Sequence, residues 1–286
     1  MSSPKMVLVT GAAGQLGATL QVESNKFEGL EWVFMDSHQL DITDKKQVEE
    51  VLNSKDFDFC INCAAFTNVE QAEMDPKKAM AVNFEGVKNI VDTIKDKDTV
   101  LIHLSTDYVF DGMKKVAYQE SDDTNPINEY GKSKLLGENY IVEQLKRYYI
   151  VRTSWLFSGF SSNFYTFIRS KLKENDKIRV ISSQTGAPTS TIDLSHGLIK
   201  MIQTEEKNYG IFHFSNSGLT NWYIFAKEII RSLDPKKMDQ LTEIDSFKSQ
   251  AKRPNNSKLD SSRFERVFDH EIPHWKDALT RVIENH

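Results

Sequence analysis

Two side chains that suit acid–base chemistry lie four residues apart in the segment NEYGKSKLLGE, residues 128–138. They are Tyr130 and Lys134, and residues four apart share one face of a helix. The same stripe continues at helical spacing through Gly137, Ile141, Leu145 and Tyr148. Because its later members are mostly apolar, the stripe should face the core, which predicts that Lys134 is turned inward. A lysine on the solvent side of the helix would lie on the opposite face.

A lysine buried beside a tyrosine favours a proton-transfer site. Lowering the pKa of a tyrosine from ~10 to near 7 requires roughly 4 kcal/mol. One ammonium about 4 Å away supplies on the order of that amount at an effective dielectric constant near 20. The sequence therefore predicts Tyr130 as a general acid whose pKa is lowered by Lys134.

Further polar side chains follow an expected strand in the segment HLSTDYVFDG. This strand should end near Ser105 and Thr106, at the carboxyl edge where ligands bind in parallel α/β sheets. We expect Thr106 to hydrogen-bond the substrate oxygen that Tyr130 protonates, with Ser105 as the alternative. Asp107 is expected to contact the substrate, the alternative being a turn residue.

A glycine-rich turn follows the first expected strand in VLVTGAAGQLG. Gly11, Gly14 and Gly17 would let the backbone approach a pyrophosphate, and the next helix would point its amide groups at that anion. The alternative is a tight strand–helix turn without a ligand. The position of the turn after the first strand of an alternating chain favours a dinucleotide site.

An acidic residue, Asp36, follows the next expected strand. In such folds an acid at this point can bind both hydroxyls of the adenosine ribose. Ser37, His38 and Gln39 come next, and none of them could receive a 2′-phosphate as Arg or Lys would. This favours NADH over NADPH, although Asp36 could also be an ordinary turn residue. Asp41 and Ile42 are expected on the adenine side, and Lys134 should reach the nicotinamide ribose.

The elements that must position these groups alternate along the first half of the chain. Apolar strand candidates are KMVLVTG, EWVFMD, DFCINCAA, VLIHLST and RYYIVRTSW, with expected helices at 44–54, 75–96 and 132–147. This order predicts an α/β fold with a Rossmann-type, doubly wound parallel sheet that is buried on both faces.

The pattern loosens from about residue 155. Turn-rich stretches separate expected helices at 163–174, 191–204, 221–233 and 275–285. We therefore expect a dinucleotide-binding domain over residues 1–154. Residues 155–286 should form a smaller, mainly substrate-binding C-terminal domain, with some segments returning to the first sheet.

Composition excludes several classes of protein. The 286 residues are 39% hydrophobic and 27% charged, with a formal net charge of −5. A general nucleic-acid binder would carry a basic surface. No apolar run reaches the roughly 18 residues that span a bilayer, and the N-terminal segment does not resemble a signal peptide. We therefore expect a cytoplasmic enzyme or binding protein with no nucleic-acid or membrane partner.

Two other features have mainly structural interpretations. Cys60 and Cys63 form a C-x-x-C pair inside an apolar segment, and residues three apart on a strand point to opposite faces. They are interpreted as core cysteines. Asn83 lies on the apolar stripe 79–83–86–90, where a buried amide needs partners. Either an anchoring hydrogen bond beneath the site or a proton-relay role fits it.

The glycine pattern, the threonine after the VLIHLST strand and the Tyr-x-x-x-Lys motif together resemble the extended short-chain dehydrogenase/reductase family. Within it, an ordered set of segments resembles the dTDP-4-dehydrorhamnose reductases and spans residues 10 to 260. The segments are TGAAGQLG, LDITD, NCAAFTNVEQAE, STDYVFDG, NEYGKSKLLGE, RTSWLF, SSNF, QTGAPT and KRPNNSKLD.

The resemblance implies reduction of the 4-keto group of dTDP-6-deoxy-L-lyxo-4-hexulose to dTDP-L-rhamnose, with hydride from NADH or NADPH. It implies Tyr130 as proton donor, Lys134 as its activator and Thr106 as the orienting residue. The implied substrate contacts are Thr106, Asp107, Trp155, Asn163 and Arg253, the last because a diphosphate suits a bidentate cation. The implied cofactor contacts are Gly11, Gly14, Gln15, Leu16, Gly17, Asp36, Asp41, Ile42, Ala65, Phe66, Thr67, Tyr130 and Lys134.

At several positions the sequence differs from related enzymes, and the properties linked to those positions are not predicted for this chain. Some members dimerise around a magnesium ion held by glutamates, whose positions here hold Thr19 and Ile192. We therefore predict no metal, and the sequence leaves open whether a homodimer forms. Nucleotide-sugar 4,6-dehydratases use a glutamate where this chain has Tyr108. The remaining alternatives are a reductase of another 4-keto-6-deoxy sugar nucleotide and a non-catalytic role like that of the regulatory subunit of methionine adenosyltransferase.

Overall fold

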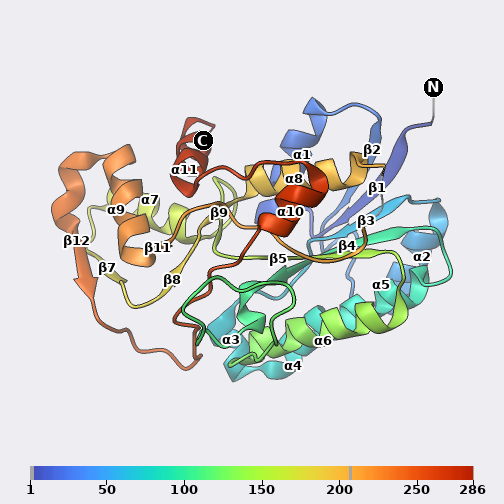
Figure 1. Cartoon of the computed structure of the whole chain (residues 1–286), viewed down its shortest axis with the longest axis horizontal. Coiled ribbons are helices and arrows are strands. Elements are labelled where there is room, and N and C mark those ends of the chain that lie inside the picture. The colour runs from blue at the N-terminus through green and yellow to red at the C-terminus, as the bar shows by residue number, and fades with distance from the viewer. Residues whose placement is uncertain (1–2, 206–207, 286) are drawn as a thin grey trace.

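A six-stranded parallel sheet organises the computed structural model, which describes residues 3–205 and 208–285 (Figure 1). Three neighbouring strands end together at the carboxyl edge of the sheet, where Thr10 pairs with both Met35 and Asn62. The strand order reverses around β1 (Lys5–Thr10), which creates the switch point where ligands bind in such sheets. In spatial order the strands are β10 (Gly210–His213), β5 (Tyr148–Thr153), β4 (Val100–Thr106), β3 (Phe59–Asn62), β1 (Lys5–Thr10) and β2 (Leu30–Met35).

Helices cover both faces of this sheet, as the continuous apolar strands predict. Along β1, Val7 and Val9 face one core and Leu8 faces the other. The first face carries α1 (Gln15–Glu23), α8 (Thr191–Gln203) and α10 (Ser262–Phe268). The second face carries α2 (Lys45–Ser54), α5 (Gly86–Ile94) and α6 (Glu129–Gln144). The doubly wound Rossmann-type arrangement is therefore confirmed.

A separate apolar cluster forms the smaller part of the molecule beyond the sheet (Figure 1). Phe225 and Ile229 are fully buried there. Its helices are α7 (Phe164–Glu174), α9 (Trp222–Leu233) and α11 (Trp275–Glu284). Its strand pairs are β7 (Ile178–Ile181) with β12 (Leu241–Ile244), β8 (Thr185–Gly186) with β11 (Thr220–Asn221), and β6 (Leu156–Phe157) with β9 (Thr189–Ser190).

The C-terminal half also returns to the large sheet. Strand β10 pairs with β5, and α8 packs in the same core as α1. A domain division between residues 154 and 155 stays a prediction. Within residues 3–205 and 208–285, no helix is long and apolar enough to cross a membrane.

Helix α6 carries the Tyr130–Lys134 stripe but ends earlier than the periodicity suggests. Lys134 is 1% exposed, which confirms that it is turned inward. Leu145 is already extended, and Tyr148 begins β5, where it pairs with Leu101. The expected helix over 132–147 is therefore wrong at its end, because the apolar strand residues happen to continue the helical spacing.

The expected helix over 75–96 is divided into shorter pieces. A short helix α3 (Val69–Met74) precedes α4 (Pro76–Met80), and a π-helical turn (Ala81–Glu85) leads into α5. Three short 3₁₀ helices cover Ser24–Lys26, Asp107–Val109 and Pro235–Gln240. Asn83 lies in the π-helical turn and is fully buried. Gly137 of α6 packs directly against it, since a Cβ on Gly137 would lie 2.5 Å from the Asn83 carbonyl oxygen.

Replacing Gly137 should therefore destabilise the fold. In Gly137→Ala, the added methyl group must separate α6 from the π-helical turn. We expect the free energy of unfolding to fall by about 1–3 kcal/mol, measured by urea denaturation. Asn139→Ala, at an exposed position of the same helix, is the control and should stay within about 0.5 kcal/mol of the wild type. A Gly137→Ala protein as stable as the control would contradict the close packing.

Candidate active site

A cavity of about 480 Å³ opens at the carboxyl edge of the large sheet, between the sheet and the smaller part of the molecule. Both halves of the chain line it. Thirteen of the predicted site residues meet here: Gly11, Gly14, Gln15, Leu16, Gly17, Ala65, Thr67, Thr106, Asp107, Tyr130, Lys134, Trp155 and Asn163.

The glycine turn forms one wall of this cavity and is built for close backbone approach. Gly11 has φ +66°, and a Cβ there would lie 2.6 Å from the Ala64 nitrogen. A Cβ on Gly17 would lie 2.5 Å from the Gly11 oxygen. Gly14 begins α1 without a side-chain capping hydrogen bond. The amino end of α1 is thus exposed to the cavity, and this arrangement fits a pyrophosphate.

Four predicted cofactor residues lie outside the cavity lining. Asp36 accepts hydrogen bonds from the backbone of His38 (2.8 Å) and of Gln39 (3.1 Å). Asp41 accepts one from the Thr43 backbone at 2.9 Å, and Ile42 is buried in the core. The fourth is Phe66, whose backbone is held by Asn83. Contacts of these four residues with a cofactor stay predictions.

Asn83 anchors the loop that follows β3. Its Oδ1 accepts from the Phe66 N–H at 2.8 Å, while its Nδ2 donates to the Phe66 oxygen at 2.9 Å. The Nδ2 also contacts Ser133 Oγ at 3.0 Å. The anchoring interpretation is confirmed, because the amide fixes the stretch from which Ala65 and Thr67 reach the cavity.

Lys134 and Tyr130 both line the cavity, but their electrostatic relation differs from the expected one. The Lys134 amine donates to the Leu104 oxygen at 2.6 Å and contacts His103 Nε2 at 3.2 Å, both on β4. Burial lowers the pKa of Lys134 to about 8. Burial raises the pKa of Tyr130 to about 12, although a hydrogen bond with Thr106 opposes this rise. The prediction that Lys134 lowers the Tyr130 pKa is therefore wrong, because burial dominates.

Thr106 and Ser105, the two candidates at the end of β4, have different surroundings. The Thr106 hydroxyl accepts from the Tyr108 N–H at 3.1 Å and faces Tyr130. The Ser105 hydroxyl donates to Glu138 at 2.5 Å. Glu138 is in turn held by Arg152 in a buried ion pair of 2.6 Å. This buried network engages Ser105, so Thr106 is the hydroxyl that stays beside Tyr130.

Asp107 presents a buried carboxyl group to the cavity. Its Oδ1 accepts from the Thr106 hydroxyl at 3.0 Å. Its Oδ2 is buried without a hydrogen-bond partner in the described parts of the chain. Burial raises the pKa of Asp107 to about 7. Hydrogen bonding by Ser257 and Thr106 opposes this rise, and the unpaired Oδ2 can accept from a polar ligand.

Trp155 is held in an uncommon backbone conformation, with φ 48°. Its ring stacks on Trp222, with centroids 3.7 Å apart and planes at 10°. Gly186 leaves room for the ring, since a Cβ there would lie 2.8 Å from it. The strained backbone, the stack and the glycine together fix a flat indole face at the cavity wall.

The side chains of Asn163 and Arg253, the remaining predicted substrate residues, are bound to other residues of the protein. Asn163 caps α7, accepting from the Thr166 N–H at 3.2 Å and donating to the Ser158 oxygen at 3.0 Å. Arg253 does not line the main cavity. It forms an ion pair with Glu70 at 2.7 Å and lines a neighbouring cavity of about 220 Å³. Trp222 lines both cavities, so the two adjoin.

Several cavity residues lack a clear signal in the sequence: Thr153, Ser154, Ser161, Ser162, Phe164 and Trp222. Thr153 ends β5, and the others come from loops and helix starts whose positions depend on the tertiary fold. The sequence could have indicated Glu138, because it follows Lys134 by four residues on the inward face of α6.

The interpretation of both cysteines as core residues is confirmed for Cys60, which is fully buried. Cys63 is only half-buried; it faces the other core and lines the cavity. Burial raises the pKa of both thiols.

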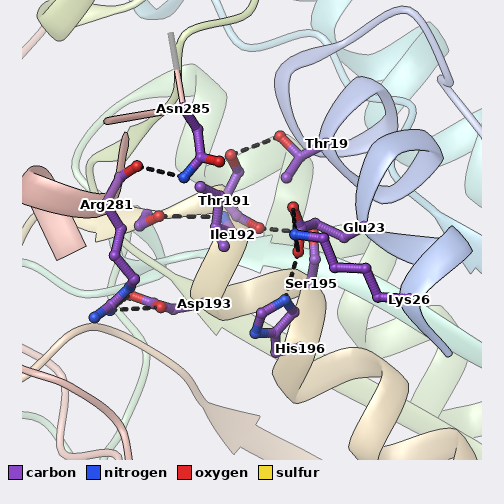
Figure 2. Close-up of polar contacts among 11 residues, drawn as sticks. Thr19, Glu23, Lys26, Thr191, Ile192, Asp193, Ser195, His196, Arg281 and Asn285 are labelled. Carbon is purple, nitrogen blue, oxygen red and sulfur yellow. Dashed lines mark hydrogen bonds and ion pairs between the residues drawn. The ribbon is translucent and has the colours of Figure 1, made fainter. Parts of the chain in front are cut away.

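Helices α1 and α8 meet near the positions that hold glutamates in some members of the resembled family (Figure 2). Thr19 pairs with the Thr191 hydroxyl at 2.7 Å, beside Ile192. Glu23 binds His196 at 2.6 Å on the same interface. Among the residues that the structure describes, no group of three or more His, Cys, Asp or Glu side chains could hold a metal ion.

Comparison with known proteins identifies relatives along the whole chain. The family model described as the RmlD substrate binding domain matches residues 5–286. A dTDP-4-dehydrorhamnose reductase of Aggregatibacter actinomycetemcomitans is 35% identical, covering 96% of this chain and 97% of the relative. A dTDP-4-keto-6-deoxy-D-glucose reductase of Streptomyces niveus is 34% identical, covering 96% of each.

A solved structure extends the likeness to three dimensions. The dTDP-4-dehydrorhamnose reductase of Bacillus anthracis, crystallised in complex with NADP, superposes with a TM-score of 0.91 at 34% identity and covers 99% of both chains. The family match, the extent of these alignments and the site geometry agree. This chain belongs to the family described by the RmlD substrate binding domain.

Proposed function

We propose that this protein is an NAD(P)H-dependent reductase that converts the 4-keto group of dTDP-6-deoxy-L-lyxo-4-hexulose to the alcohol of dTDP-L-rhamnose. The observation that carries the proposal is the meeting of Tyr130, Lys134 and Thr106 with the glycine turn in one cavity. Relatives named as reductases of dTDP-linked keto sugars support it. The cytoplasmic location expected from the sequence stays a prediction.

The residues present fit a nicotinamide dinucleotide. Gly11, Gly14 and Gly17 line the cavity, and a Cβ at Gly11 or Gly17 would clash with neighbouring backbone and displace the turn that presents the amino end of α1. When bound, the reduced nicotinamide supplies a hydride to the carbonyl carbon. We assign Lys134 to the nicotinamide ribose, because its buried amine is a hydrogen-bonding group on this wall of the cavity.

The proton required for reduction would come from Tyr130. With a pKa of about 12, the phenol stays protonated at neutral pH and can donate to the alkoxide oxygen that develops as hydride arrives. We assign Thr106 to orient that oxygen, since its hydroxyl lies beside the phenol. Reduction requires the acid to begin with its proton, and the phenol meets that requirement.

The sugar nucleotide would lie across the second wall. We assign the flat face of Trp155, backed by Trp222, and the buried carboxyl group of Asp107 to the sugar side. Arg253, in the adjoining cavity, is the proposed diphosphate contact, because guanidinium groups bind phosphates in bidentate geometry. Asn163 would act by shaping the loop that precedes α7.

Another 4-keto-6-deoxy sugar nucleotide is the second candidate substrate. The named activity of the Streptomyces niveus relative favours it, since that protein is as similar in sequence as the rhamnose reductases. A 4,6-dehydratase is disfavoured, because Tyr108 lacks the carboxylate needed at its position. A non-catalytic regulatory role predicts cofactor binding without turnover.

The proposal is tested with purified protein and dTDP-6-deoxy-L-lyxo-4-hexulose. Consumption of NADH or NADPH, followed by absorbance, should yield dTDP-L-rhamnose. Tyr130→Phe should lower kcat by about 10²–10⁴-fold, the usual contribution of a general acid. The affinity for the cofactor, measured by fluorescence, should stay the same in this variant. Cofactor binding without turnover in the wild-type protein would instead favour another keto sugar or the regulatory role.

Cofactor choice gives a second prediction, which concerns Asp36. If its carboxylate lies beside the adenosine ribose, it should repel a 2′-phosphate and favour NADH. Asp36→Asn should then raise the NADPH-to-NADH ratio of kcat/KM by about tenfold, which corresponds to about 1.4 kcal/mol. Asp41→Asn, from the neighbouring turn, serves for comparison. An unchanged ratio in Asp36→Asn would remove Asp36 from the cofactor site.

The tryptophan stack gives a third prediction. Trp222→Leu removes the ring that supports Trp155, so KM for the sugar nucleotide should rise by about tenfold, near 1.4 kcal/mol. The dissociation constant for the cofactor should not change, because Trp222 and Trp155 are not among the proposed cofactor contacts. Trp32→Leu, which removes the tryptophan of the Trp32–Phe34 pair on β2, is the control. Equal effects of the two substitutions on KM would contradict the assignment.

A further inference from the structure

A chain of buried polar side chains runs from β1 beneath the cavity to Lys134. The Thr10 hydroxyl donates to Asn62 Oδ1 at 2.7 Å. Asn62 Nδ2 contacts His103 Nδ1 at 3.1 Å, and His103 Nε2 contacts the Lys134 amine at 3.2 Å. The four side chains are between 0 and 1% exposed. Solvent therefore has no direct access to the contacts, so donors and acceptors must match within the chain.

The Asn62 amide fixes the direction of this chain. Its Oδ1 accepts from the Thr10 hydroxyl and also from the Ala64 N–H at 3.2 Å. The Nδ2 group must then be the one that faces His103, and it can only donate. His103 Nδ1 accordingly acts as the acceptor and carries no proton.

The protonation of His103 follows from that constraint. Burial, with the nearby Lys134 amine, holds the pKa of His103 well below its usual range, so the ring is neutral. A neutral imidazole carries one proton. Because Nδ1 accepts from Asn62, the proton lies on Nε2 and points at the Lys134 nitrogen.

An N–H donor opposite Lys134 favours the uncharged amine. An ammonium has three donors and no acceptor, whereas a neutral amine has a lone pair that can accept from His103 Nε2–H. The Leu104 carbonyl takes an amine hydrogen in either state, at 2.6 Å. The direction of the hydrogen bond from His103 to Lys134 agrees with the lowered pKa of Lys134. Burial is the largest cause of that lowering.

The other titratable groups around Lys134 come from three elements. Glu138, on the same helix, raises the Lys134 pKa, but its carboxylate is paired with Arg152 of β5 at 2.6 Å. Cys63, beyond β3, acts in the same direction as Glu138. Tyr130, one turn earlier on α6, stays protonated at neutral pH. His103, on β4, is the group in direct polar contact that a substitution can remove without changing these three.

We propose that His103 is a positioning residue: oriented by Asn62 and Thr10, it holds an N–H donor against the Lys134 amine and favours release of its proton near neutral pH. As pH rises through the Lys134 pKa, the amine loses its charge. It then no longer attracts ligands in the cavity electrostatically. In the proposed reductase, on which this consequence rests, kcat/KM should fall on the alkaline side at the pH where Lys134 titrates.

The test is a direct titration of Lys134 by NMR in protein labelled at lysine Cε. The resonance missing from Lys134→Met identifies the residue, and its midpoint in the wild-type protein should lie near 8, because burial lowers the Lys134 pKa. His103→Gln places an amide where its oxygen can accept from the ammonium. The midpoint should rise by about one pH unit or more in this variant.

A second variant keeps the imidazole and reverses its tautomer. In Asn62→Asp the carboxylate accepts from Nδ1–H, so Nε2 becomes an acceptor for the ammonium, and the Lys134 midpoint should again rise. The matched control is His213→Gln, because His213 is equally buried, on β10, and binds the Tyr118 oxygen at 3.0 Å instead. It should leave the midpoint unchanged.

An unchanged or lower midpoint in the folded His103 and Asn62 variants would overturn the proposal, as would an equal shift in His213→Gln. The pH profile of kcat/KM gives the linked readout, since its alkaline limb should move upward with the midpoint in His103→Gln. Failure of the reductase function would abolish turnover in all variants and leave the NMR titration intact, so the two failures are distinguishable.

Discussion

The need to satisfy a buried lysine amine constrains much of this structure. A lysine that is 1% exposed requires partners for its polar head. The Leu104 carbonyl and the His103 ring supply them from β4, which fixes α6 against the carboxyl end of that strand. Gly137 allows the π-helical turn to press against the same helix. Tyr130, one turn before Lys134, is thereby held beside Thr106.

The cavity itself depends on how the chain crosses between its two halves. Strand β10 extends the large sheet, and α8 packs beside α1, so the C-terminal half is tied to the glycine turn. The segment that leaves β5 then brings Trp155 to the lining of the same cavity as the glycines. A cofactor and a sugar nucleotide would thus meet at the switch point of the sheet, where the strand order reverses.

Periodicity predicted much of this arrangement. The alternating apolar segments indicated the parallel sheet, and the inward stripe of α6 indicated the buried Lys134. Spacing could not reveal that Tyr148 begins a strand, since its position continues the helical stripe. Nor could it reveal the raised Tyr130 pKa, which depends on burial by residues distant in sequence. Trp222 entered the site only through its stack with Trp155, a contact set by tertiary packing.

In the proposed reaction, hydride passes from the nicotinamide to C4 of a dTDP-linked keto sugar within this cavity. Isotope transfer measures that step directly. The wild-type protein would be supplied with dTDP-6-deoxy-L-lyxo-4-hexulose and with nicotinamide cofactor deuterated at the transferred position, and the product examined by NMR. The proposed reaction predicts dTDP-L-rhamnose that carries deuterium at C4. Oxidation of the cofactor without deuterium at C4, or no transfer with either NADH or NADPH, would contradict it.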